Sequence, residues 1–408
     1  MDTHDQVDRL RARAMARWWR KVGGSADLAR ARREMHSELT RPDEGPESQV
    51  QITRRTFIHR SVLAGAAGAA TYGWFPLINT LDFAYGQQAP FRFAWVSDNH
   101  LYPKDVNTRF VEKTTRAFKE VQAMSPAADF MIHGGDLAQL GDPVELDLGA
   151  DLLKEVQIRK VFIPGEHDWY LDMGQKWMAL FGKPNWTFDH KGVRVVGLDT
   201  VSHGPDYWTV KKMTPKERMG HMATLDGSVA GAWAGVGRDQ MQWLDQTLSN
   251  WPKDNPIIIF SHNPLYEYYP PWNFWVRDWR ELHEVLKPYG NVTNVHGHTH
   301  QVLYNEVGKM RSIGMLATSW PWPYAPEGVP ALTRCTVRVD PGDHFDGVGW
   351  SQLSVGAGGR VENEYMLWRK KEHTYAEAAH DSGCGDNANQ ILRPRMADQE
   401  WVYLGAYK

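Results

Sequence analysis

The sequence predicts a layered α/β domain, and three observations lead to that prediction. From Phe91 onward, short apolar segments alternate with segments of helical periodicity, which is the pattern of strands joined by helices. Polar side chains follow five of the apolar segments directly, and several of these turns contain glycine. The first 86 residues share neither feature, so we expect them to be separate from this domain.

The first half of the domain is expected to form a βαβαβ unit. Its strands are short and rich in apolar residues, and the proline that begins its second helix is tolerated in a first helical turn. The expected strands are Phe91–Ser97, Asp129–His133 and Lys160–Pro164, and the expected helices are Asn107–Met124, Pro143–Val156 and Gly174–Phe181.

The second half adds a hairpin, further strands and two helices. The hairpin is expected from Trp186–His190 and Val193–Leu198, closed at Lys191-Gly192; the helices are Arg238–Trp251 and Arg277–Pro288; the strands are Pro256–Phe260, Asn291–His296, Val302–Glu306, Arg311–Ala317 and Thr333–Val339. The long connections Gly204–Gly237 and Tyr266–Asp278 are rich in Gly, Pro and Trp. Connections of this length are usually functional, so we expect lids or rims of a site.

Composition excludes several classes of protein. The 408 residues include 17 His but only 2 Cys, which excludes a disulfide-stapled scaffold and a cysteine-ligated zinc cluster. Any bound metal must therefore be held by His and carboxylates. The net charge of −3 gives no general attraction to nucleic acid, and no specific nucleic-acid binding is expected. Cys335 and Cys384 are equally compatible with a disulfide after export and with free thiols.

The N-terminal region divides into a leader and a signal-like segment. Residues 1–50 hold ten Lys/Arg and nine Asp/Glu, whereas residues 51–86 contain Arg54-Arg55, Phe57 and an uncharged stretch from Ser61 to Leu81. This order resembles a twin-arginine (Tat) export signal, which implies the Tat machinery as a partner and a periplasmic or other extracytoplasmic location. If the small-residue site at Ala84-Tyr85-Gly86 is not cleaved, residues 56–81 would act as a membrane anchor. The alternative is an Ala-rich packed helix.

Five expected strands end in residues that bind metals. In open α/β sheets ligands bind at that edge. Carboxylates and imidazoles without thiolates suit Mn, Fe or Zn, and two such cations need a bridging carboxylate. The strand ends carry Asp98-Asn99-His100, Gly134-Gly135-Asp136, Gly165-Glu166-His167-Asp168, His262 and Gly297-His298-Thr299-His300.

These pieces, spread over roughly Phe93 to Gln301, resemble the calcineurin-like metallophosphoesterases. The resemblance implies a four-layer α/β/β/α double β-sandwich. We expect this domain to span residues 90–345, and the residues that follow, 346–408, to form a C-terminal extension packed on it. The resemblance also implies two divalent or trivalent metal ions and the hydrolysis of phosphomonoesters or phosphodiesters by a metal-bridging hydroxide. By this resemblance, Asp98, His100, Asp136 and His300 bind the first metal, Asp136, Glu166, His262 and His298 bind the second, and His167 is the general acid, held by Asp168.

The chain departs from the family pattern at two positions. Glu166 stands where the family has Asn, so a carboxylate replaces a neutral carbonyl ligand. The added charge is expected to bind a hard cation more tightly and to repel phosphate, which leaves open another metal pair, a less anionic substrate such as a diester, or weak activity. Gln139 stands where the family has a further Asp or Asn. The rival hypothesis is a catalytically weak or non-catalytic metal-binding subunit associated with a membrane.

Other residues near the motifs have structural alternatives. His133 and His296 lie inside apolar strands and are expected to be core histidines, with a hydrogen bond to a ligand as the alternative. Asp199 is expected to cap a turn. Aromatic residues that follow the motifs fit a substrate-facing wall and core packing equally well: Trp169, Tyr170, Tyr266, Tyr268, Tyr269, Trp272 and Trp275.

Overall fold

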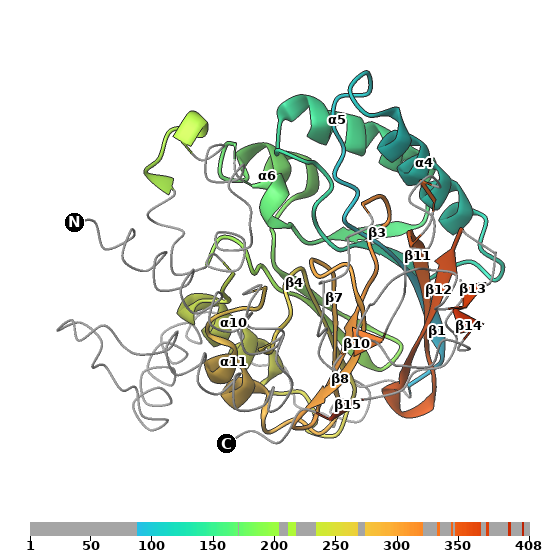
Figure 1. The fold of residues 1–408 in the computed structure, drawn as a ribbon. Coiled ribbons are helices and arrows are strands. Elements are labelled where there is room, and N and C mark those ends of the chain that lie inside the picture. The colour runs from blue at the N-terminus through green and yellow to red at the C-terminus, as the bar shows by residue number, and fades with distance from the viewer. Residues whose placement is uncertain are drawn as a thin grey trace, which may run out of the picture. The chain divides into compact units, whose positions relative to one another are not determined.

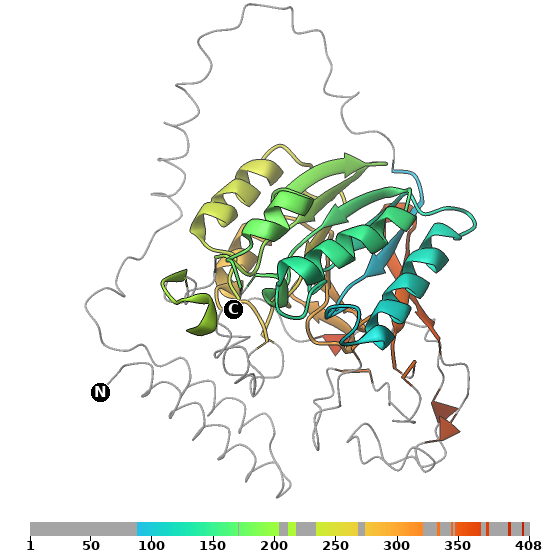
Figure 2. The ribbon, with the colours of Figure 1, turned by 90° about the horizontal axis from the view of Figure 1, so that it is seen from above.

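Two β-sheets pack face to face, and helices cover their outer faces (Figures 1 and 2). In the first sheet the strand order is β12-β11-β1-β2-β3. β1, β2 and β3 run parallel, as the predicted βαβαβ unit requires, and β11 and β12 add to β1 in antiparallel pairing. The bounds are β1 Phe91–Val96, β2 Phe130–His133, β3 Arg159–Phe162, β11 Gly349–Val355 and β12 Val361–Leu367.

The second sheet has the order β10-β8-β9-β7-β6-β5-β4, with β15 also pairing to β8. Its central strands β5, β6, β7 and β9 are parallel. The bounds are β4 Trp186–His190, β5 Val193–Gly197, β6 Ile257–Ser261, β7 Val292–His296, β8 Val302–Val307, β9 Met310–Gly314, β10 Thr333–Arg334 and β15 Val402–Tyr403; β13 His373–Thr374 and β14 Ile391–Leu392 form a separate pair.

The helices complete the predicted four-layer α/β/β/α arrangement. α4, α5 and α6 accompany the first sheet, and α10 and α11 lie on the side of the second sheet (Figure 1). Their bounds are α4 Thr108–Gln122, α5 Pro143–Leu152, α6 Gln175–Phe181, α10 Arg238–Leu248 and α11 Trp279–Leu286, with 3₁₀ turns η2 Leu153–Glu155, η3 Glu166–Asp168 and η5 Ala357–Gly359. Each helix was expected within a few residues of these bounds. None of the helices in the described part of the chain is both long and apolar enough to cross a membrane.

Aromatic side chains from both sheets fill the space between them. The rings of Phe93 and Phe130 stack at 5.2 Å in the first sheet, and Phe260 of the second sheet meets Phe93 edge-on at 5.4 Å. All three side chains are essentially inaccessible to solvent. Burial of each such side chain contributes roughly 1.5–3 kcal/mol, so this contact fixes one sheet against the other and with it the relative positions of the strand ends.

Strands β11 and β12 lie in the segment that we expected to be a C-terminal extension. β11 pairs with β1 and β12 pairs with β11, so residues 349–367 belong to the first sheet and the domain continues past residue 345. The pattern Val361–Leu367 alternates buried and less buried residues, as a half-covered strand does.

The structure describes residues 88–169, 171–203, 211–217, 234–267, 274–320, 344–345 and 347–368, and the short strands at 333–334, 373–374, 391–392 and 402–403. Several predictions fall outside the described residues. These are the leader 1–50, the signal-like segment 51–86 with its site at Ala84-Tyr85-Gly86, Cys335, Cys384, Tyr170, Tyr268, Tyr269 and Trp272, and much of the connections and of the extension.

Candidate metal centre

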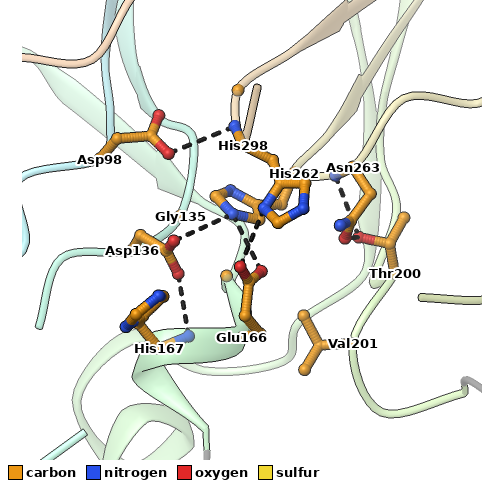
Figure 3. Close-up of polar contacts among 12 residues, drawn as sticks. Asp98, Gly135, Asp136, Glu166, His167, Thr200, Val201, His262, Asn263 and His298 are labelled. Carbon is orange, nitrogen blue, oxygen red and sulfur yellow. Dashed lines mark hydrogen bonds and ion pairs between the residues drawn. The ribbon is translucent and has the colours of Figure 1, made fainter. Parts of the chain in front are cut away.

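The predicted ligand residues meet at the carboxyl ends of β1, β2, β3, β6 and β7 (Figure 3). None of them is more than 7% exposed. Their potential ligand atoms fall into compact groups, within each of which all atoms lie no more than 4.8 Å apart. We call Asp98, His100 and His300 the first group, and Asp136, Glu166, His262 and His298 the second group; His100, Asp136 and His167 form a third set that links them.

The backbone at the centre is unusual. Seven non-glycine residues of the described chain have a positive φ, and five of them are predicted ligands: Asp98 (53°), His100 (48°), Asp136 (53°), His298 (63°) and His300 (48°). Left-handed backbone costs a non-glycine residue about 1 kcal/mol or more. Such strain persists only where the surroundings hold it, and it concentrates at functional sites. The five residues therefore mark the centre independently of their side-chain chemistry.

Two glycines let neighbouring turns approach the ligands closely. A Cβ on Gly165 would lie 2.0 Å from Asp136 Oδ1, and one on Gly135, whose φ is +102°, would lie 2.5 Å from His262 Nδ1. Atoms at these separations overlap, so only glycine fits. The motif glycines thus make room for ligand side chains from other strands.

The first group is oriented by contacts outside itself as well as within it. Asp98 accepts hydrogen bonds from Ser97 Oγ and from the backbone N–H of His298, and its Oδ1 lies 3.1 Å from His300 Nε2. His100 places its Nδ1 2.9 Å from Gln139 Oε1, and its Nε2 faces Asp136 Oδ2 at 3.7 Å. Each side chain therefore has one contact that sets its direction.

The second group is held mainly by contacts between its own members (Figure 3). Glu166 lies 3.2 Å from His262 Nε2 through Oε2 and 2.8 Å from His298 Nδ1 through Oε1. His262 Nε2 also lies 3.2 Å from Asp136 Oδ2, while its Nδ1 donates to the Gly134 carbonyl at 2.8 Å. That donation fixes the tautomer and leaves Nε2 as the ligand atom of the neutral ring.

Charge pairing dominates the protonation of the second group. Burial raises the pKa of the Glu166 carboxyl, but the His298 and His262 imidazoles outweigh it, and the net pKa lies well below the usual range. Burial lowers the pKa of His262, but the Asp136 and Glu166 carboxylates raise it well above the usual range. A proton on His262 thus balances two carboxylates at the place where a cation would do the same, so metal and proton compete for this group.

Several buried atoms of the centre have no hydrogen-bond partner among the described residues. Apart from ion-pair contacts within the centre, these atoms are His100 Nε2, His262 Nε2, His298 Nε2 and Glu166 Oε2. Buried polar groups without partners are rare in folded proteins and need an explanation. Imidazole nitrogens and a carboxylate oxygen facing one another are the donor set of a Mn, Fe or Zn site, so the residues present fit a metal.

His167 lies beside both groups with its ring held by a main-chain atom. Its Nδ1 is 2.7 Å from the Gln139 carbonyl oxygen, and its backbone N–H donates to Asp136 Oδ1 at 3.0 Å. Burial lowers the pKa of His167, but the Asp136 and Glu166 carboxylates outweigh it, and the net pKa is raised. The ring is therefore biased toward the protonated form, as a proton donor requires.

Asp168, which we expected to hold the His167 ring, bonds to the backbone of two neighbouring turns, and the Gln139 carbonyl contacts Nδ1 of the ring. Both carboxylate oxygens of Asp168 accept backbone N–H groups, from Ala138 at 2.9 Å and from Gly165 at 3.1 Å. Asp168 therefore ties the turn after β3 to the turn after β2. Burial, with the nearby Asp136 carboxylate, raises the pKa of Asp168 to about 7.

The structure shows the surroundings of the residues near the motifs that were expected to have structural roles. Asp199 caps a turn as expected, because its Oδ1 accepts from the N–H groups of Val201 and Ser202. His133 is a core histidine whose Nε2 contacts Asn99 Oδ1 at 2.8 Å, and His296 places its Nδ1 3.0 Å from the Gly297 carbonyl. Of the aromatic residues, the structure describes three, all of them buried: Trp169, Tyr266 and Trp275.

Sequence reasoning missed the supporting role of two polar residues. Gln139 was noted only as a departure from a pattern, although it contacts both His100 and His167. Ser97 was read as the end of a strand, although it joins Trp95 Nε1 to the Asp98 carboxylate. Ser97 could have been predicted from the sequence, because it is a polar residue directly beside a predicted ligand. No feature of the sequence indicates where the Gln139 side chain points.

Comparison with known proteins places these motifs in a family. The family model described as calcineurin-like phosphoesterase matches residues 91–302, which is slightly more than half of the chain. The chain is 22% identical over 242 residues to the 3′,5′-cyclic-nucleotide phosphodiesterase alr5338 of Nostoc sp., a match that covers 57% of this chain and 80% of that protein. It is 25% identical over 239 residues to the 3′,5′-cyclic adenosine monophosphate phosphodiesterase CpdA of Haemophilus influenzae, covering 55% and 75%.

A similar solved structure is that of a dimetal phosphatase from Danio rerio. It covers 67% of this chain and 98% of that chain, with a TM-score of 0.47 and 14% identity.

Proposed function

Because the chain belongs to the calcineurin-like phosphoesterase family, we propose that it is a dinuclear metal-dependent hydrolase that cleaves phosphodiesters. The observation that carries the proposal is the pair of buried carboxylate–imidazole groups beside a histidine that is not needed as a ligand. Asp136 belongs to the second group and its Oδ2 also lies 3.7 Å from His100 Nε2, so both groups would share its carboxylate if each held a cation.

In this proposal, the first group with Asp136 would hold one metal ion, and the second group would hold the other. Two cations at these positions would lower the pKa of water and neutralise the charge of a phosphoryl group. The protein contributes fixed ligand directions, because His262 is oriented by the Gly134 carbonyl and His100 by Gln139. It also contributes burial, which strengthens each electrostatic contact.

His167 is proposed to act as the general acid. With its Nδ1–H donated to the Gln139 carbonyl, the proton that it can transfer sits on Nε2. As the oxygen of a water molecule bonds to phosphorus and releases a proton to solvent, the bond from phosphorus to the leaving oxygen breaks. The leaving alkoxide takes the proton from Nε2, and the neutral ring then takes up a proton from solvent. The raised pKa of His167, caused by the two nearby carboxylates, favours the charged form before the reaction.

A phosphodiester is proposed as substrate for two reasons. Glu166 adds a buried negative charge to the second group, and this repels a phosphomonoester dianion more than a diester monoanion. Two of the relatives are named as cyclic-nucleotide phosphodiesterases. Both observations favour a diester, and the second favours a nucleotide.

The test combines metal analysis with turnover. We expect about two transition-metal ions per purified chain, hydrolysis of bis(4-nitrophenyl) phosphate and of cyclic AMP with Mn²⁺, and loss of that activity by at least about 100-fold in His167→Ala. His203→Ala, at a half-exposed histidine after β5, is the control and should retain activity. Less than one metal per chain together with no turnover would instead support a non-catalytic subunit.

We further propose that the protein is exported by the Tat machinery, on the strength of Arg54-Arg55 and the uncharged segment that follows. In a bacterial host with a Tat system, a fusion of residues 1–90 to a reporter that works only outside the cytoplasm should be active. A double Arg54→Lys/Arg55→Lys variant should abolish that activity. Equal activity of both fusions would contradict export by this route.

A further inference from the structure

Gln139 contacts two histidines of the centre with two different oxygen atoms. Its side-chain Oε1 lies 2.9 Å from His100 Nδ1, and its main-chain carbonyl oxygen lies 2.7 Å from His167 Nδ1. The residue is 6% exposed, so water does not compete freely for either contact. One residue thus faces both a predicted ligand of the first metal and the predicted general acid.

These contacts determine which ring nitrogen carries a proton. A carbonyl oxygen only accepts hydrogen bonds, so each neutral ring must keep its proton on Nδ1 and present the lone pair of Nε2. For His100, Nε2 is the atom that faces Asp136. If the amide nitrogen of Gln139 faced the ring instead, the proton would sit on Nε2, and His100 could not bind a metal there. The oxygen-facing arrangement is therefore the one that a ligand needs.

We propose that the Gln139 side chain is a positioning residue for the first metal, acting only through His100, whereas the main chain of the same residue positions His167. The proposal rests on the proposed function in so far as the first group must bind a metal. The two roles of Gln139 can be separated by experiment, because a substitution at position 139 changes the side chain and leaves the main-chain carbonyl in place.

The main chain at Gln139 is held without the help of its side chain. Its N–H donates to the Leu101 carbonyl at 2.9 Å, and the next N–H, of Leu140, donates to Glu145 Oε2 at 2.8 Å. Glu145 is itself buried and closes the capping box of α5 with Asp142. A variant side chain at 139 should therefore leave the His167 contact intact.

The experiment is a metal titration of metal-free protein with Mn²⁺ by calorimetry, using Gln139→Leu and Gln139→Glu. Leu has a similar size but no acceptor, so we expect the affinity of one of the two sites to fall about 10- to 100-fold, with the other site unchanged. Glu keeps an acceptor oxygen, so it should hold the first-site affinity near that of the unmodified protein. At saturating Mn²⁺, the rate of Gln139→Leu should return to within a few-fold of normal, since His167 is unaffected.

The matched control is Gln240→Leu. Gln240 is also a buried glutamine, 3% exposed, and its side chain bonds to the Asp199 backbone away from the centre. It should lower thermal stability without changing either metal affinity. If Gln139→Leu binds both metals normally, or if Gln240→Leu weakens binding as much, the positioning role is overturned while the proposed function stands. If the unmodified protein binds no metal, both proposals are overturned.

Discussion

The two groups of the candidate centre both combine carboxylates with imidazoles but are held in different ways. In the first group, Asp98 is fixed by Ser97 and by a backbone N–H, and His100 is fixed by Gln139. In the second group, Glu166 and His262 contact one another at 3.2 Å. The first group has one internal pair, Asp98 with His300, and is otherwise arranged by its surroundings, whereas the second is arranged mainly by charge pairing among its members. The first should respond to changes in neighbouring residues, and the second to changes in its own charge.

Asp136 is the residue on which this comparison depends most, because it reaches both groups. Asp136→Asn removes the charge that His262 contacts at 3.2 Å and His100 at 3.7 Å. We expect phosphodiester hydrolysis to fall by about 10³-fold, the upper range for loss of a single electrostatic group, and both metals to bind more weakly. Activity on bis(4-nitrophenyl) phosphate and metal content by mass spectrometry are the measurements.

Asp199→Asn is the matched control for this substitution. Asp199 is a fully buried carboxylate that also follows a strand of the second sheet, but its contacts are to the backbone and side chains of its own turn, including the Ser202 hydroxyl and the His203 ring. Its variant should keep both metals. If Asp136→Asn loses only one metal, the carboxylate does not bridge, and the two groups are more independent than their geometry indicates.

Most of the centre could be predicted from the sequence because each predicted ligand lies next to the strand that positions it. Each ligand follows a strand directly, and the parallel βαβαβ order brings the strand ends of one sheet to one edge. The strands themselves were found from short apolar runs. This is why the seven predicted ligand residues, which come from five strands, lie together in the structure.

What the sequence could not predict depends on contacts between distant segments. β11 pairs with β1 more than 250 residues away, and nothing in its own pattern says which strand it joins. The partner of the His167 ring is a carbonyl 28 residues earlier, and no residue type marks a carbonyl for that role. Asp98 and His100 have a left-handed φ that their residue types do not favour, so this conformation depends on the surrounding turns and not on the local sequence.

Gly165→Ala tests how tightly the two groups are packed together. Its new Cβ would lie 2.0 Å from Asp136 Oδ1, so the carboxylate or the turn must move. Overpacking of this kind costs about 1–3 kcal/mol, and we expect a matching loss in the free energy of unfolding together with weaker metal binding. Chemical denaturation and metal titration measure the two effects.

Gly356→Ala is the comparison for that variant. The nearest atom to its Cβ is the Arg360 carbonyl oxygen at 3.9 Å, an ordinary contact, so the change in stability should stay within about 0.5 kcal/mol. Equal effects of the two substitutions would mean that the crowding at Gly165 is relieved without cost, so the two groups are packed less tightly than these distances indicate.

Glu166→Asn tests whether charge controls the second group. Removing the carboxylate takes away the partner of both His262 and His298, and we expect the second metal to bind about tenfold more weakly. Less repulsion of a dianion should raise the ratio of kcat/KM for 4-nitrophenyl phosphate to that for bis(4-nitrophenyl) phosphate. Glu166→Gln keeps the length of the side chain and should change the ratio in the same direction. If only the Asn variant changes it, length rather than charge is the relevant property.

His283 supplies the baseline for what burial alone does to a histidine, outside either group. Burial lowers the pKa of His283 to about 4, whereas the carboxylates of the second group raise that of His262. The folded state therefore protonates His283 less readily than the unfolded state, in which a histidine has a pKa of about 6.5. The stability from the neutral ring is complete above pH 6.5 and is lost as the pH falls toward 4, by up to about 1.4 kcal/mol per pH unit.

His283→Gln can still donate to the Leu265 carbonyl but does not titrate, so metal-free protein with this change should show a shallower loss of unfolding free energy over that range. If the unfolding free energy of the unmodified protein and of His283→Gln falls in parallel with pH, the acid sensitivity arises in the charged groups of the centre and not from burial of the His283 ring.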